Sequence, residues 1–276
     1  MQLGDTSIDL LDTGTFLLDG GAMFGVVPKV LWHRACPADD RNRITMGLNC
    51  MLIRRPDATV VVDTGIGQHY DEVFVDRYGA DLAAGIVPAL AGAGVTPEQV
   101  THVILTHLHF DHAAGNCVRS SPDADWQPAF PNARFLMPEV ELANAKVPDG
   151  RSQGSYWPHT WESVAATNQV DTFHDEELLP GVRARHAPGH TAGHHVVTVD
   201  AGDRRVCFVA DLLPTEHHLR SAWIMAYDLY PAQTLETKQT LVAEAIAEHW
   251  LLAFEHSTTM RFATVGDDGC AKAADG

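Results

Sequence analysis

One heptapeptide constrains this chain more than any other feature of its sequence. THLHFDH places His107, His109, Asp111 and His112 within six residues, directly after an apolar run at 103–105. That run predicts a buried strand, and alternate residues of an extended segment share one face, so His107 and His109 should point together. A turn after His109 would aim Asp111 and His112 differently, which suits a second ion beside the first. Because burial of unliganded imidazoles and carboxylates costs free energy, the spacing predicts metal binding.

Three further metal-type residues each follow a predicted strand. They are His190 after APG, Asp211 after RVCFVA, and His256 after LLAFE. An α/β fold gathers such distant residues at one edge, outside the ends of its strands. Imidazole and carboxylate ligands suit zinc, iron, manganese or cobalt. The five cysteines are scattered and form no CxxC, which argues against a thiolate zinc site and against a disulfide framework.

Apolar strand patterns alternate with helical ones in both halves of the chain. Residues 7–17 and 43–54 read as strands, and 232–249 reads as the best helix. The Gly/Pro-rich segment between the first two strands reads as a long irregular loop, and residues 150–175 show no clear period. The polar C-terminal tail is expected to fray. The alternation predicts an α/β fold.

Charge and composition limit the classes of partner. The chain has 276 residues, with 19 Lys and Arg against 36 Asp and Glu, and a formal net charge of −17. A polyanion is bound by a Lys/Arg surface, so we expect no nucleic-acid partner. No stretch reaches about 18 apolar residues, so no membrane partner is expected either. The N-terminus lacks the pattern of a signal peptide, and with the scattered cysteines this predicts a cytoplasmic protein.

With these residues in view, the chain resembles the metallo-β-lactamase superfamily of metal-dependent hydrolases. The resemblance rests on HxHxDH, on GHTxGH around His190, on the Asp before Leu212, on FEHS, and on VVVDTG upstream. It implies an αββα sandwich, an α/β (α+β) fold with two mixed sheets face to face and helices outside. It also implies one domain over residues 1–276, with a core at about 43–262 and an N-terminal hairpin and loop at 1–42.

The resemblance also assigns roles to the seven residues. His107, His109 and His190 would hold one divalent ion, and Asp111, His112 and His256 the other. Asp211 would bridge the two ions, and Asp111 and Asp211 would act in catalysis through a hydroxide shared by the metals. Zinc is the expected metal, with iron, manganese or cobalt as alternatives. Asp63 of VVVDTG would orient a ligand imidazole, or would be a simple turn residue.

The reaction expected from this resemblance is hydrolysis of an ester-type bond, with a lactone or other carboxylic ester favoured. Lactonases of the superfamily carry a Tyr shortly after the bridging Asp, whereas Asp211 is followed by Leu-Leu-Pro-Thr, so Tyr227 and Tyr230 are the residues available for that role. Alternatives are phosphodiester or phosphotriester hydrolysis, a glyoxalase II-like thioesterase without its C-terminal helical extension, an iron-dependent redox protein, and a non-catalytic metal-binding protein.

Two aromatic segments are candidates for substrate contact. GGAMFGVVPKVLW contains Met23 and Phe24, SYWPHTW contains Trp157, and Tyr227 lies further along. Aromatic loops over a metal site suit an apolar, uncharged part of a small-molecule substrate. The same residues would also suit packing of the loops or a homodimer contact. Of the remaining histidines, His194 and His195 are expected to be structural, and the pair at 217–218 lines the pocket or lies on a solvated loop.

Overall fold

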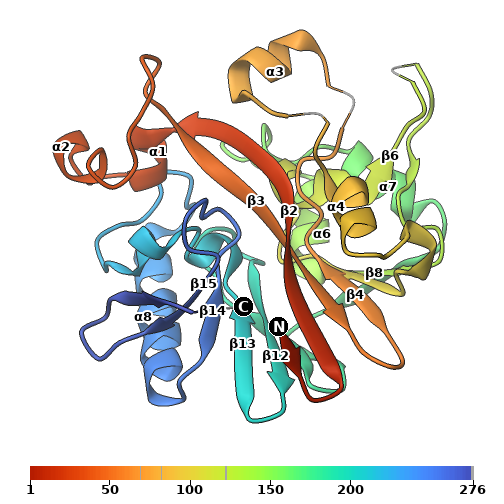
Figure 1. Ribbon diagram of the computed structural model, residues 1–276. Helices are drawn as coiled ribbons and strands as arrows, with labels where there is room; N and C mark the ends of the chain where they lie inside the picture. The colour runs from red at the N-terminus through yellow and green to blue at the C-terminus, as the bar shows by residue number, and fades with distance from the viewer. Residues whose placement is uncertain (69, 82, 122, 275–276) are drawn as a thin grey trace.

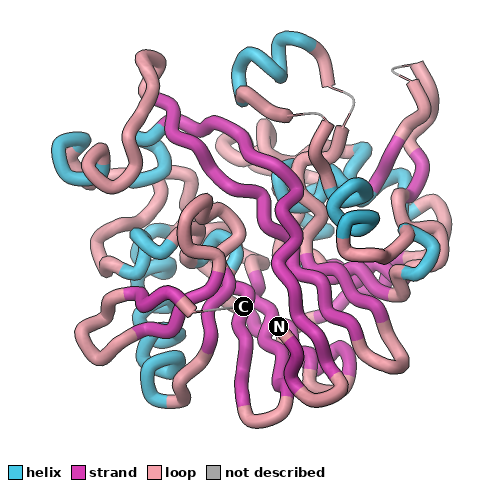
Figure 2. Tube along the Cα trace, in the orientation of Figure 1, coloured by secondary structure: helices cyan, strands magenta, loops and turns pink. Residues whose placement is uncertain are grey.

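Two mixed β-sheets of seven strands each pack face to face, and helices cover their outer faces (Figures 1 and 2). The computed structural model describes residues 1–68, 70–81, 83–121 and 123–274. This arrangement confirms the predicted αββα sandwich. The chain builds the first sheet completely before it enters the second, because β9 ends at Phe173 and β10 begins at Glu176.

The first sheet contains an antiparallel half and a parallel half. Its order is β1 (Gln2–Leu3), β2 (Thr6–Asp19), β3 (Arg43–Arg54), β4 (Thr59–Val62), β5 (His102–Ile104), β8 (Arg134–Pro138) and β9 (Val170–Phe173). Strands β4, β5, β8 and β9 run parallel, with Val61 beside Val103 and Val103 beside Phe135. The carboxyl ends of these parallel strands therefore meet at one edge of the sheet.

The second sheet is antiparallel except for one central pair. Its order is β10 (Glu176–Leu179), β11 (Val182–His186), β12 (His195–Ala201), β13 (Arg204–Phe208), β14 (Leu251–Ala253), β15 (Phe262–Val265) and β16 (Ala271–Ala273). Strands β13 and β14 run parallel, with Cys207 beside Leu252. A short hairpin of β6 (Cys117–Val118) and β7 (Gln127–Pro128) lies apart from both sheets.

Helices pack on both outer faces of the sandwich (Figure 1). The α-helices are α1 (Gly20–Phe24), α2 (Lys29–Trp32), α3 (Glu72–Tyr78), α4 (Ile86–Gly92), α5 (Phe110–Ala113), α6 (Glu139–Lys146), α7 (His159–Ala165) and α8 (Pro231–Ala247). The 3₁₀ turns are η1 (Pro97–Gln99), η2 (Ala114–Asn116), η3 (Ala210–Leu212) and η4 (Glu216–Leu219). Helix α8 coincides with the helix predicted at 232–249.

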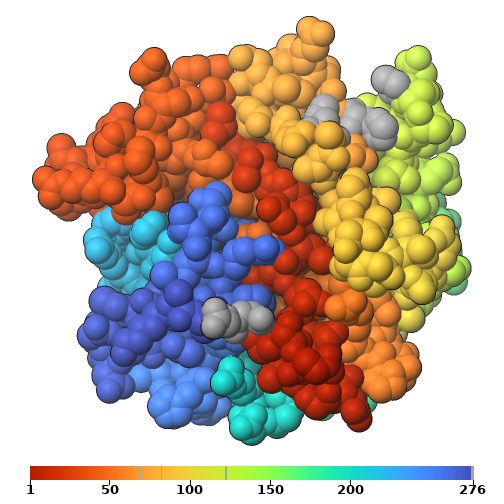
Figure 3. Space-filling model, in the orientation of Figure 1, coloured from red at the N-terminus to blue at the C-terminus, as the bar shows by residue number. Residues whose placement is uncertain are grey.

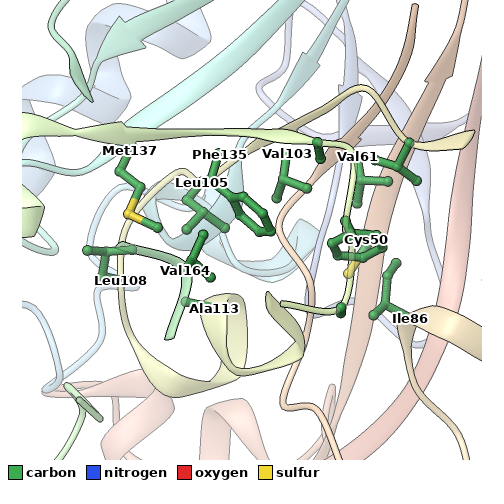
Figure 4. Close-up of a cluster of buried hydrophobic side chains, with 14 of the residues drawn as sticks. Cys50, Val61, Ile86, Val103, Leu105, Leu108, Ala113, Phe135, Met137 and Val164 are labelled. Atoms are coloured by element: carbon green, nitrogen blue, oxygen red, sulfur yellow. The ribbon is translucent and has the colours of Figure 1, made fainter. Parts of the chain in front are cut away.

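Three apolar layers hold the sheets and helices together. Between the sheets, residues such as Ile53 and Val60 of the first sheet pack with Val197 and Phe208 of the second. A second layer joins the first sheet to α4, α6 and α7 and contains Cys50, Val61, Val103, Leu105, Phe135 and Val164 (Figure 4). A third joins the second sheet to α8 through Leu241 and Ala245. The strands are apolar on both faces because both faces are covered.

The N-terminal segment begins with the β1–β2 hairpin and contributes to the core. Strand β2 pairs along the length of β3, and its Ile8 and Leu10 lie in the layer between the sheets. Figure 3 shows this segment, in red, wedged between the blue C-terminal residues and the yellow residues of the first half. The sandwich therefore extends to the N-terminal side of the core expected at 43–262.

Several elements form where the sequence pattern predicts none. Helices α1 and α2 lie in the segment expected to be an irregular loop, and Phe24 of α1 stacks on Trp32 of α2 with ring centroids 5.4 Å apart. Helix α7 and strand β9 lie within 150–175. Strand β16 pairs with β15 in the tail that was expected to fray. Within the described part of the chain, no helix combines the length and apolar character needed to cross a membrane.

Candidate metal centre

The segment after β5 carries four of the predicted ligands. The chain stays extended through His109, whose φ is −66° and ψ 153°, and then turns into the short helix α5. His107 and His109 therefore precede the turn, while Asp111 and His112 lie on the helix. All four are buried, with at most 8% of each residue exposed. The change from strand to helix after His109 is the one that the spacing predicts.

The other three predicted ligands follow strands of the second sheet. His190 lies in the connection from β11 to β12, Asp211 in the turn η3 after β13, and His256 directly after β14. Ala210, immediately before Asp211, has a φ of 42°, a left-handed conformation that costs free energy for a residue other than glycine. This turn bends the chain sharply at the end of β13 and sets the position of Asp211.

Four of the seven side chains converge on one point. His190 Nε2 lies 3.0 Å from His109 Nδ1 and 3.1 Å from Asp211 Oδ2. His107 Nε2 lies 3.8 Å from the same Asp211 oxygen. Three imidazole nitrogens and one carboxylate oxygen thus face a common centre, and all these donor atoms lie within 4.8 Å of one another.

A second group lies on the other side of Asp211. Asp211 Oδ1 is 3.0 Å from His256 Nε2 and 3.5 Å from His112 Nε2. The two imidazole nitrogens are 3.3 Å apart, and Asp111 Oδ2 lies 3.7 Å from that of His112. Asp211 therefore presents one carboxylate oxygen to each group. The structure brings together all seven residues predicted from the sequence.

The chemistry of these donors fits two divalent cations. His107 Nε2 and Asp211 Oδ1 are buried and have no hydrogen-bond partner among the described residues. Burial lowers the pKa of His107 and His109 well below the ordinary value, which keeps both rings in the neutral, metal-binding form. Burial opposes ionisation of Asp211, but the imidazoles of His190 and His112 hold its pKa well below its usual range. Buried charge and unpartnered donors of this kind are stabilised by bound cations.

A layer of hydrogen bonds orients the ligand imidazoles. His112 Nδ1 lies 3.1 Å from Asp63 Oδ2, and Asp63 also accepts hydrogen bonds from the backbone and hydroxyl of Thr106. His107 Nδ1 lies 3.1 Å from the same hydroxyl oxygen, so Asp63 reaches two ligands. Asp63 has a φ of 55°, as expected for a turn, so both readings of this residue describe the structure. Such partners fix which ring nitrogen faces the metal.

Two residues that the sequence analysis did not select lie against imidazoles of the candidate ligands. Asp228 Oδ1 lies 2.9 Å from His190 Nδ1, and Glu255 Oε2 lies 2.9 Å from His112 Nδ1. Both carboxylates are buried. Burial raises the pKa of Glu255 to about 8. Asp228 is 38 residues from His190, so no local sequence pattern reveals it. Glu255 directly precedes His256 at the end of an apolar run, and this position could have identified it as a candidate from the sequence.

Two more buried residues hold the loops of the centre. His194 donates from Nδ1 to the Ala187 carbonyl, and its Nε2 accepts from the backbone N–H of Asp211. Glu141, on α6, accepts hydrogen bonds from Thr191 Oγ1, the Gly193 N–H, the Tyr156 hydroxyl and, at 3.3 Å, the Leu108 N–H. His194 therefore has the structural role expected for it, because its ring accepts a hydrogen bond from the backbone of Asp211.

A cavity of about 430 Å³ opens over the centre. Of the predicted substrate contacts, Met23 and Tyr227 line it, together with His109, Asp111, His190, Asp211 and His256. Tyr227 is 39% exposed, and its partial burial raises its pKa above the ordinary value, so its hydroxyl is protonated.

The other two predicted contacts lie outside this lining. Phe24 is buried in the apolar cluster beside the N-terminal helices, where it stacks on His218 with ring centroids 5.1 Å apart. Trp157 stacks on Phe110 at 4.4 Å. These two rings pack loops against the fold, which is the alternative reading of the aromatic segments. The histidines at 217–218 also lie outside the cavity lining.

The fold and the donor set together define a class of protein. The family model of the metallo-β-lactamase superfamily matches residues 45–117 and 140–256, so the chain belongs to that superfamily. A probable metal-dependent hydrolase from Staphylococcus aureus has a similar structure, with a TM-score of 0.91, 32% identity, and coverage of 99% of this chain and 97% of that one. The family and this relative support assignment of the chain as a metal-dependent hydrolase.

Two lactonases are also similar to the chain. AidC, a dizinc quorum-quenching lactonase, shares the fold with a TM-score of 0.82, 18% identity, and coverage of 100% of this chain and 97% of that one. An N-acyl homoserine lactonase of Bacillus cereus is 25% identical over 169 residues, which cover 58% of this chain. The matched part spans 60% of the length of that relative.

Proposed function

We propose that this protein hydrolyses carboxylic esters, with lactones as the favoured substrates, and that it does so with two divalent ions, zinc first among them. The observation that carries the proposal is Asp211, whose two carboxylate oxygens face two separate groups of imidazoles beneath a partly apolar cavity. The similarity to N-acyl homoserine lactonases supports a lactone as substrate. Because the whole chain has a net charge of −17, a neutral ester should approach the site more easily than an anionic substrate.

The residues of the site fall into two groups, those that would bind the metals and those that would position the substrate. His107, His109 and His190 would hold one ion, Asp111, His112 and His256 the other, and Asp211 both. Bound divalent ions supply Lewis acidity, which lowers the pKa of water and polarises a carbonyl group. Tyr227 lines the cavity with a protonated hydroxyl and would donate a hydrogen bond to an oxygen of the substrate. Leu18, Met23 and Met225 would contact its apolar part.

Ligand substitution with a substrate panel tests this proposal. His109→Ala and Asp111→Ala should abolish hydrolysis and reduce the metal content, since each removes a donor from one group. His174→Ala is the matched control because His174 is exposed and pairs with Glu139 away from the centre. The panel should contain lactones, open-chain esters, thioesters and phosphotriesters, assayed before and after chelation.

The expected result is a highest kcat/KM on lactones that chelator removes and added metal restores. Wild-type turnover in either ligand variant would refute the ligand assignment. Activity confined to the phosphotriesters or thioesters would show that the proposed substrate class is wrong, but it would still support the proposed metal centre.

A further inference from the structure

The cavity over the metal centre contains one side chain that is permanently cationic. Among the described residues that line it, only Arg151 is an arginine or lysine. Much of the remaining lining is apolar or aromatic, including Leu18, Tyr78, Phe110 and Met225. In a chain with a net charge of −17, a guanidinium at the substrate cavity is a local exception to the overall charge.

Hydrogen bonds on both sides hold Arg151 at the cavity wall. The Asp149 carboxylate accepts from the backbone N–H groups of Arg151 and Ser152, which fixes the turn that carries the side chain. Arg151 Nη2 donates to the carbonyl oxygens of Ala226, at 2.5 Å, and Asp228, at 3.1 Å. These two residues flank Tyr227, so the guanidinium lies against the loop that carries the tyrosine.

The same guanidinium keeps donors that the protein does not use. Nε and Nη1 of Arg151 make no hydrogen bond to any described residue, and the residue is exposed. The loop that it contacts also supports the metal centre, since Asp228 bonds to His190 and the Leu229 N–H donates to the His190 carbonyl. The hydrogen bonds of Nη2 to this loop therefore hold the guanidinium at the wall of the cavity that opens over the centre.

We propose that Arg151 is a specificity-determining residue, which donates a hydrogen bond to a second oxygen of the substrate, beyond the ester bond that is cleaved. The favoured substrate is then an ester or lactone with an apolar part against the cavity wall and a distal carbonyl or carboxylate oxygen for Arg151. This inference rests on the proposed function, which supplies the ester bond that is cleaved. Binding of the distal oxygen by Arg151 can be measured separately from cleavage. A guanidinium donates to either acceptor, more strongly to a carboxylate.

Matched esters measure this selectivity. Phenyl hexanoate, phenyl adipamate and monophenyl adipate have the same leaving group and chain length, and they end in a methyl group, an amide and a carboxylate. Homologues with acyl chains of four and eight carbons vary the distance between the ester bond and the terminal group that would meet Arg151. The variants are Arg151→Ala and Arg151→Lys. The control is Arg183→Ala, which makes the same change in net charge at an exposed arginine paired with Asp175.

In Arg151→Ala, the ratio of kcat/KM for an acceptor-ending ester to that for the methyl-ending ester should fall at least tenfold at the best chain length. Arg151→Lys should keep part of the ratio for the carboxylate, and Arg183→Ala should keep all of it. An equal loss on all three esters would show that Arg151 only clamps the 225–229 loop, and an unchanged ratio at every length would equally overturn the proposal.

Equilibrium binding separates this inference from the proposed function. Calorimetry with adipate, adipamate and hexanoate needs no turnover, and wild-type protein should bind the first two more tightly than hexanoate, with the difference lost in Arg151→Ala. If none of the esters is cleaved but this difference is present, the ester activity fails and the Arg151 site stands. If cleavage occurs without the difference in binding, the Arg151 site fails and the ester activity stands. Metal content and circular dichroism check that each variant is folded.

Discussion

At the scale of single residues, the histidines of this chain divide into those of the candidate metal centre and those with structural roles. His218 shows the difference. It is buried, its Nε2 donates to the Met23 carbonyl, and its Nδ1 accepts from the Thr215 hydroxyl. Burial lowers the pKa of His218 to about 3, and the charge of Lys238 acts in the same direction. This imidazole is neutral in the folded protein and joins the N-terminal helices to the turn η4.

The pKa of His218 predicts a dependence of stability on pH. Between about pH 6.5 and 3 the unfolded chain binds a proton at this residue that the folded chain does not, so the free energy of unfolding should fall as the pH falls. The contribution is at most about 1.4 kcal/mol per pH unit. In His218→Gln this part of the slope should be absent, as measured by urea unfolding from pH 7 to 4.

A matched variant isolates that effect. His174→Gln removes an exposed histidine and should keep the wild-type slope. The charged groups around His218 (Lys238, His217 and Asp211) are present in all three proteins, so their contributions cancel in the comparison. A slope in His218→Gln equal to that of the wild type would contradict the assignment.

At the scale of elements, Glu141 connects α6 to both ligand loops. In Glu141→Gln, an amide nitrogen would replace one of two oxygens that each accept two hydrogen bonds, at a cost of about 1–3 kcal/mol in the free energy of unfolding. Metal affinity should also fall, by about 10–100-fold, because Leu108 and Thr191 adjoin the ligands His109 and His190. Chemical denaturation and metal titration measure the two effects. Glu139→Gln, at the exposed start of the same helix, should change neither.

Helix α8 packs on the loop of His190 through a glycine. Gly189 has a φ of 141°, and a Cβ there would lie 2.5 Å from the backbone nitrogen of Thr234. Gly189→Ala should therefore destabilise the protein by about 1–3 kcal/mol and weaken metal binding. A Cβ at Gly150 meets open space, so Gly150→Ala should lie within about 0.5 kcal/mol of the wild type. Equal effects of the two substitutions in urea unfolding would contradict this account.

The sequence predicts the elements with a strong apolar period and the ligands at their ends. Strands such as β5 and β14 are visible in the sequence as apolar runs, and His107 and His256 each lie three residues after the end of their strand. Helices α1 and α2 are not predictable in this way, because contacts such as Phe24 on Trp32, rather than periodicity, hold them. Asp228 acts on His190 across 38 residues and Glu141 acts on Thr191 across 50, and only the folded chain brings these partners near each other.

At the scale of the whole molecule, the metal centre joins the two sheets. Four donors follow β5 of the first sheet, and the other three follow or connect strands of the second. Bound ions thus add cross-links between layers that are otherwise joined mainly by apolar packing, so metal binding should be coupled to global stability.

Removal of the metals should therefore lower the thermal stability of the entire protein. A metal at 100 times its dissociation constant contributes about 2.7 kcal/mol to the free energy of unfolding. Chelator should lower the Tm in one cooperative transition, and added zinc should restore it. The same treatment of Asp111→Ala, measured by calorimetry, should produce a smaller shift. A chelator-induced shift of equal size in that variant would contradict coupling through the centre.

The chain crosses from the first sheet to the second once, between Phe173 and Glu176. Each sheet is thus made from one continuous half of the sequence. A break in this turn would leave an N-terminal fragment with His107, His109, Asp111 and His112, and a C-terminal fragment with His190, Asp211 and His256. Neither fragment has a complete set of donors, so a functional centre would report directly on the reassociation of two separately made polypeptides.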